Sequence, residues 1–223
     1  LMSELFREID SELRQDKARE WLLRYGPRIL IVCVIGIFLV AIGVYLREQE
    51  MERREAATAE LIGIVGEGPR PTDLSVEQLQ QYVANTKGEI AAIGQFHLAG
   101  ELARDGDVDG ALANYKELAA NSDLTQELRD LASLYSIMLR MNDESQTADA
   151  LIAELAPLTG ADVAWNLTAQ ELTALLHIKN GNEEQGRQII ADLLEVTNLP
   201  LGMRRRLFQW TEIYGEPANP EQS

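Results

Sequence analysis

The sequence predicts an all-α protein, in which a single transmembrane helix precedes a domain of repeated helix pairs, an α-solenoid. Three observations predict this fold. Residues 29–46 form an apolar run of 18 residues without a charge. Beyond it, no stretch alternates with the period of two that marks strands. Three segments, which begin at residues 101, 138 and 176, align without internal gaps at intervals of 37 and 38 residues.

The chain is expected to divide into five parts. These are a cytoplasmic amphipathic leader over residues 1–28, a transmembrane helix over 29–46, a helical stalk and linker over 47–74, a helical repeat domain over 75–214 and a disordered tail over 215–223.

Composition excludes several function classes. The 223 residues carry 36 acidic and 20 basic side chains, a formal charge of -16, which argues against nucleic acid as a partner. The single cysteine, Cys33, excludes an intramolecular disulfide and a cysteine-based zinc site. The two histidines, His97 and His177, lie in no catalytic motif. We therefore expect no enzyme, no cofactor, no metal site and no small-molecule substrate.

The leader has the spacing of an amphipathic helix. Leu5, Ile9 and Leu13 recur every four residues, so they share one face. Two interpretations remain open. The helix lies at the lipid headgroups, or it binds a cytoplasmic partner.

The apolar run has the length of a membrane anchor. Eighteen helical residues span about 27 Å, close to the hydrocarbon thickness of a bilayer. Charged residues follow the run directly where a signal peptide would have a cleavage site, which favours an uncleaved anchor. Five basic residues lie within fifteen positions before it and three within fifteen after it, which places the N-terminus in the cytoplasm and the large domain across the membrane.

The aligned segments carry small and large side chains in matching columns. A small residue on each of two antiparallel helices permits close approach, and large residues one turn away fill the groove. Gly106-Asp107, Asn142-Asp143 and Asn180-Gly181 supply turns, and a closing helix over Leu201–Tyr214 covers the open end. Two columns hold small residues: Ala99, Ser136 and Ala174 form one, and Ala111, Ala148 and Gly186 form the other. Three columns hold mostly large residues: Tyr115, Ile152 and Ile190; Leu118, Leu155 and Leu193; and Leu102, Leu139 and His177.

These columns resemble those of the tetratricopeptide repeat. Ala99, Ala111 and Tyr115 fit its small and aromatic positions best. The intervals of 37 and 38 residues exceed the usual period of about 34. The resemblance therefore implies divergent tetratricopeptide-like repeats.

The whole architecture resembles the bacterial ancillary SecYEG translocon subunit family. The leader carries Phe6-Arg-Glu-Ile-Asp10, Leu13-Arg14, Trp21 and Arg24-Tyr-Gly26, followed by one span and the repeats. The resemblance implies a single-pass protein of the bacterial inner membrane with a periplasmic repeat domain. It also implies contact with the translocon, with a membrane-anchored prolyl isomerase-type chaperone and with periplasmic chaperones.

A stack of helix pairs offers a concave face from its first helices. We expect this face to bind a segment of a partner protein, although the closing helix or residues 75–85 would fill it equally well. The expected function is a membrane-anchored periplasmic protein-binding module that assists chaperone hand-over of exported proteins at the translocon. The alternative is a structural or assembly subunit of another inner-membrane complex. The candidate groove residues are Ile93, Phe96, Gly100, Arg104, Asp130, Ser133, Ile137, Arg140, Thr168, Glu171, Leu175 and Lys179.

Overall fold

The computed structural model describes residues 42–66 and 76–218. The expected leader, most of the expected transmembrane helix, the linker over 67–74 and the last five residues lie outside this part of the chain. The chain divides into two compact units, Leu1–Thr58 and Ala59–Ser223. Of the first unit, residues 42–58 are helical and almost all exposed. The helix continues to residue 65, so the second unit takes in the end of the expected stalk.

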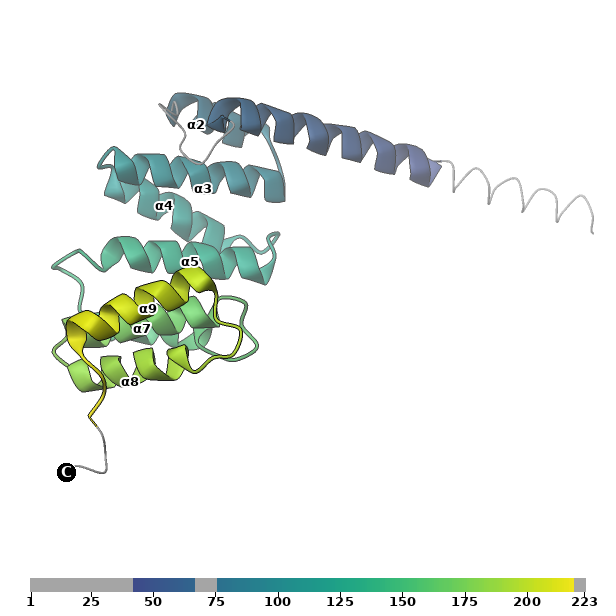
Figure 1. The fold of residues 1–223 in the computed structure, drawn as a ribbon. Helices are drawn as coiled ribbons and strands as arrows, with labels where there is room; N and C mark the ends of the chain where they lie inside the picture. The colour runs from purple at the N-terminus through teal and green to yellow at the C-terminus, as the bar shows by residue number, and fades with distance from the viewer. Residues whose placement is uncertain (1–41, 67–75, 219–223) are drawn as a thin grey trace, which may run out of the picture. The chain divides into compact units, whose positions relative to one another are not determined.

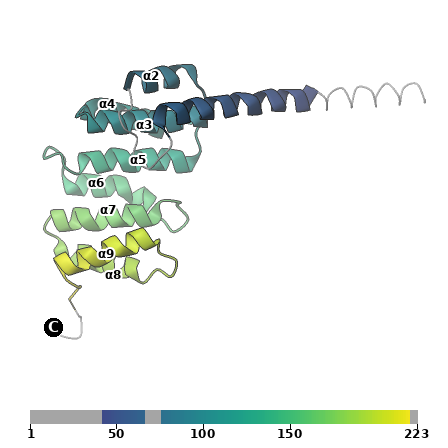
Figure 2. The ribbon, with the colours of Figure 1, turned by 45° about the horizontal axis from the view of Figure 1, so that its top comes forward.

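Every regular element among the described residues is a helix, as the sequence predicts. None of these helices combines the length and the apolarity that a membrane crossing requires. After the helix over residues 42–65, the helices of the second unit are α2 (Val76–Asn85), α3 (Glu89–Arg104), α4 (Val108–Ala120), α5 (Gln126–Arg140), α6 (Ala148–Leu155), the 3₁₀ helix η1 (Ala156–Leu158), α7 (Asn166–Lys179), α8 (Glu183–Leu194) and α9 (Leu201–Tyr214). From α2 to α8 these helices run down a stack, and α9 turns back to lie beside α7 and α8 (Figures 1 and 2).

The expected turns join the first and third helix pairs. Gly106 follows α3 and Gly181 follows α7, each with the positive φ that glycine adopts without strain, 87° and 81°. In both turns the amide after the glycine donates to a carbonyl in the last helical turn, from Asp107 to Leu102 and from Asn182 to His177. This is a Schellman motif. Asp107 then caps α4 by accepting from the Gly110 amide, so the acidic run at 105–109 is a turn and a helix cap.

The small columns mark the points where paired helices approach. A Cβ atom on Gly186 of α8 would lie 2.8 Å from the Ala174 carbonyl oxygen of α7, so only glycine fits there without a shift. Ala99, Ala111 and Ala174 are fully buried, and Ser136 is buried as well. The spacing argument from the sequence is therefore confirmed at these positions.

The middle pair departs from the repeat. α6 has only 8 residues and packs more against α7 than against α5. The turn before it lacks glycine and runs over residues 141–147. Because of this difference, the candidate groove residues on α5 do not lie in the same hollow as those on α3.

The expected closing helix forms with the expected bounds. α9 packs against α8 through Met203 and Leu207, which are buried in a cluster with Leu193 and Leu199. Helix pairs that stack in order, with a further helix packed on the last pair, are consistent with an α-solenoid.

Candidate functional site

The candidate site is a hollow of about 430 Å³ between α3 and α5. Both helices pack against α4, and α4 supplies the side chain between them. Four candidate groove residues from the sequence, Ile93, Phe96, Gly100 and Arg104, lie together in it. They follow the helical spacing of three and four residues, so they form one stripe along α3. The other lining residues are His97, Glu101, Tyr115, Leu128, Leu131 and Tyr135.

Three aromatic rings from three helices meet in this hollow. Tyr115 of α4 stacks on Tyr135 of α5 with ring centroids 5.4 Å apart. Phe96 of α3 lies tilted against both, at 6.1 Å and 6.0 Å. Burial raises the pKa of Tyr115, and the neighbouring Tyr135 hydroxyl raises it further, so the Tyr115 ring stays neutral. The cluster therefore presents uncharged aromatic surface, which suits apolar side chains.

The hollow is open to solvent. Ile93 is 42% exposed and Tyr135 is 41% exposed, although both are large and apolar. A Cβ atom on Gly100 would meet nothing within 4 Å, so the space above this glycine is empty. At one end, Arg104 donates to the buried Glu101 carboxylate at 2.8 Å. The apolar surface therefore ends at the Arg104–Glu101 ion pair.

The candidate residues on α5 lie elsewhere. Ser133, Ile137 and Arg140 line a second hollow of about 620 Å³, with Lys116 of α4 and Glu154 of α6. Arg140 binds both oxygens of Glu154, one at 2.9 Å, and this raises the pKa of the Arg140 guanidinium and lowers that of Glu154. Ile137 is 2% exposed and packs in the buried cluster that α5, α6 and α7 share, so it offers a partner little surface.

Three of the other candidate residues are bonded within the chain itself. Asp130 is buried and accepts from Gln126 at 2.6 Å. Glu171 of α7 is bound by Arg206 of α9. Lys179 donates to the Met141 carbonyl at the end of α5. Thr168 and Leu175 are half-buried. The twelve residues therefore do not form one continuous groove, and at α7 the closing helix takes part of the expected face.

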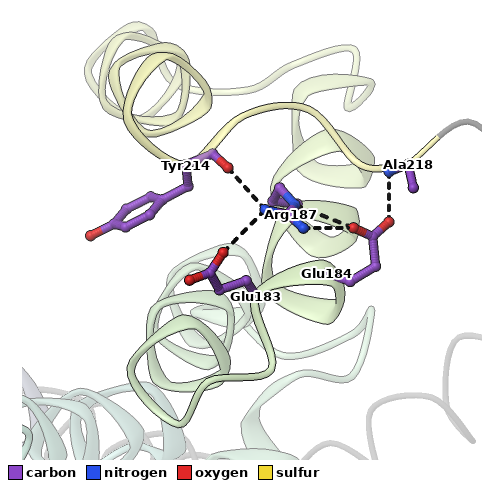
Figure 3. A network of polar contacts seen from close by, with 5 residues as sticks. All are labelled: Glu183, Glu184, Arg187, Tyr214 and Ala218. Carbon is purple, nitrogen blue, oxygen red and sulfur yellow. Dashed lines mark hydrogen bonds and ion pairs between the residues drawn. The ribbon is translucent and has the colours of Figure 1, made fainter.

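A polar network fixes the end of α9 (Figure 3). Arg187 of α8 donates to the Tyr214 carbonyl, which ends α9, at 3.1 Å, and it also pairs with Glu183 and Glu184. Glu184 accepts from the Ala218 amide, and these contacts lower the pKa of the Glu184 carboxyl. The segment after α9 is thereby held on α8.

Sequence reasoning missed the half of the hollow that α5 contributes. Leu128, Leu131 and Tyr135 are spaced by three and four residues, a stripe that the sequence displays. The repeat register pointed instead to the opposite face of α5, because it assumed that α5 and α6 pair as α3 and α4 do.

Among the described residues, no three histidine, cysteine, aspartate or glutamate side chains are grouped to hold a metal ion. Comparison with known proteins adds no assignment: no family model matches the chain. No curated protein matches it significantly, and neither does any solved structure.

Proposed function

We propose that this chain is a membrane-anchored protein-binding module that holds an apolar segment of a partner protein in the hollow between α3 and α5. The observation that carries the proposal is the open aromatic surface of Phe96, Tyr115 and Tyr135, with the empty space above Gly100. Exposed apolar surface in a concave site is typical of a binding site, and rigid aromatic rings supply most of the contact energy at such sites.

The proposed anchor over residues 29–46 would make weak binding sufficient for function. A module fixed at one place in a membrane meets its partner at a high effective concentration, in the range of about a millimolar. Shallow contacts then suffice for capture and still permit release. The resemblance to the ancillary translocon subunits supports a position at the exit of the translocon in the bacterial inner membrane, with the repeat domain in the periplasm. There the module would receive exported chains and pass them to chaperones.

The hollow can be filled without disturbing the fold. Gly100→Leu puts a branched side chain into space that is empty, and it replaces glycine in the middle of a helix, which favours the helix by up to about 1 kcal/mol. Gly63→Leu is the matched control, because Gly63 is also helical and a Cβ atom there also meets nothing within 4 Å.

The experiment uses intact membranes. A photo-crosslinking residue replaces Ile93 at the mouth of the hollow, and in a second chain it replaces Ile62, which is similarly exposed but does not line the hollow. We expect protein adducts from position 93 that Gly100→Leu abolishes and Gly63→Leu preserves. Adducts that persist in the Gly100→Leu chain would exclude the hollow as the binding site.

Exchanging residues 1–47 for an unrelated leader and span distinguishes the binding module from the alternative, a structural subunit. A binding module keeps its adducts from position 93 after this exchange. A subunit that is held in its complex by the leader and the span loses its neighbours.

A further inference from the structure

We propose that α9 is a self-association surface, through which two copies of this chain pair in an antiparallel, twofold-symmetric arrangement. The proposal does not depend on the hollow or on the partner assigned to it. It rests on the outer face of α9, the last helix of the chain, which lies beside α7 and α8 (Figures 1 and 2).

The two faces of α9 have opposite environments. Met203, Leu207, Trp210 and Tyr214 recur at intervals of four, three and four residues, and this stripe faces the rest of the domain. A second stripe with the same spacing, Leu201, Arg205, Phe208 and Glu212, is exposed.

The outer stripe is unusually apolar for the last helix of a stack. Leu201 is 82% exposed and Phe208 is 54% exposed. The terminal helix of a solenoid normally has a polar outer face, because nothing stacks on it. Two large apolar residues on the outer face of such a helix therefore indicate that another surface covers them.

The charges on the stripe identify that surface as a second copy of α9. Among the described residues neither Arg205 nor Glu212 has an ion-pair partner. A twofold axis between Phe208 and Gln209 lies 3.5 residues from each, about 5 Å along the helix. Antiparallel pairing about this axis places Arg205 of each copy opposite Glu212 of the other, and it brings the two Phe208 rings together at the centre. An interface of this symmetry must be self-complementary, and this stripe is.

The contact is small, so the dimer is weak. A helix of 14 residues is about 21 Å long, and one face of it falls well below the roughly 800 Å² per partner of a standard interface. We expect association of the full-length chain in mild detergent at concentrations of about 100 µM, with monomers at about 1 µM.

The decisive test is charge exchange between copies. In a pair of Arg205→Glu chains, the new acid of each copy lies opposite Glu212 of the other. In a pair of Glu212→Arg chains, the new base of each copy lies opposite Arg205 of the other. Like charges repel in both pairs, so each variant alone is expected to remain monomeric at about 100 µM. Mixing the two variants restores both ion pairs, because the two acids of the first variant then lie opposite the two bases of the second. We therefore expect a heterodimer in the mixture, measured by sedimentation velocity with one variant carrying a fluorescent label.

Phe208→Asp removes the central contact and is expected to weaken association at least tenfold. Met138→Asp, at an exposed position of similar size on α5, leaves it unchanged. Circular dichroism confirms that each variant keeps its helices. A wild-type chain that stays monomeric, a dimer that survives Arg205→Glu, or a mixture that fails to associate would each overturn the proposal. In the first case the stripe belongs to a different occupant, and in the second the copies meet elsewhere.

Discussion

Arg206 of α9 binds the Glu171 carboxylate of α7 through two parallel hydrogen bonds, Nε to Oε1 and Nη2 to Oε2, both 2.8 Å long. The Glu171 side chain is 5% exposed, whereas that of Arg206 is 51% exposed. The hydrogen bonds to Glu171 raise the pKa of Arg206, so the guanidinium stays protonated. It links the closing helix to the last helix pair, and it occupies a residue that the sequence assigned to the groove.

Removing the arginine leaves a buried carboxylate without a counter-ion. Exposed ion pairs contribute about 0–1 kcal/mol, and breaking a fully buried one costs about 3–5 kcal/mol. Because only one partner is buried here, we expect Arg206→Ala to cost about 2 kcal/mol of unfolding free energy. Urea titration followed by tryptophan fluorescence measures this loss, because Trp210 of α9 packs against the buried cluster beneath this helix.

Arg205→Ala is the matched control, since Arg205 is exposed and unpaired among the described residues. At dilute protein we expect it to change stability by less than about 0.5 kcal/mol. Equal losses in the two variants would show that the ion pair does not hold α9 in place.

The close approach at Gly186 predicts a stability loss for the smallest possible substitution. Gly186→Ala places a methyl group 2.8 Å from the Ala174 carbonyl oxygen and 2.5 Å from the Ile178 side chain. Alanine favours a helix over glycine by about 1 kcal/mol, but overpacking against backbone costs about 1–3 kcal/mol. We expect a net loss of about 1 kcal/mol by urea titration. Gly100→Ala, which meets no atom within 4 Å, should instead raise stability; a gain in both variants would contradict the packing argument.

The alignment of repeats predicts a stabilising substitution at His177. Leucine occupies the same column in the other two repeats, at Leu102 and Leu139. His177 Nδ1 is buried and has no hydrogen-bond partner among the described residues. An unsatisfied buried polar atom costs about 1–3 kcal/mol, so we expect His177→Leu to gain about 1 kcal/mol. His97→Leu serves as the comparison, and an equal gain there would attribute the effect to added apolar surface alone.

The Arg140–Glu154 pair predicts a pH dependence. The Arg140 guanidinium lowers the pKa of the Glu154 carboxyl from its ordinary value of 4.5. The folded chain therefore binds the Glu154 proton less readily than the unfolded chain does, and the pair stabilises the fold at pH above about 4.5. This contribution is lost as the pH falls through the lowered pKa.

We expect the wild-type chain to exceed Glu154→Gln in thermal stability at pH 7, and the difference to disappear in acid. Glu144→Gln removes one exposed acid that has no ion pair among the described residues, so it reports the effect of net charge alone. A difference between wild type and Glu154→Gln that stays constant down to about pH 2 would show that the pair does not act through the carboxylate charge.

Local signals in the sequence predicted much of the fold. The bounds of α9, the turns at Gly106 and Gly181, and the burial of Ala99, Ala111 and Ala174 all depend on residues close in the chain or on a strict period. The hollow depends in addition on how separate helices pack together. Phe96, Tyr115 and Tyr135 come together only because α3 and α5 both pack on α4, and periodicity alone does not determine that arrangement. The short α6 also breaks the register, so the candidate residues on α5 face a second hollow.

The buried apolar residues of the described chain form four separate clusters strung along the stack, each built from neighbouring helices. Such a molecule has no common centre whose loss would collapse it at once. Heat or a pulling force is expected to peel helices from one end while the remainder survives, and partial digestion should yield a ladder of folded fragments. The unfolding midpoint that one probe reports then belongs to the helices next to that probe, so each variant above is compared with the wild type by the same probe.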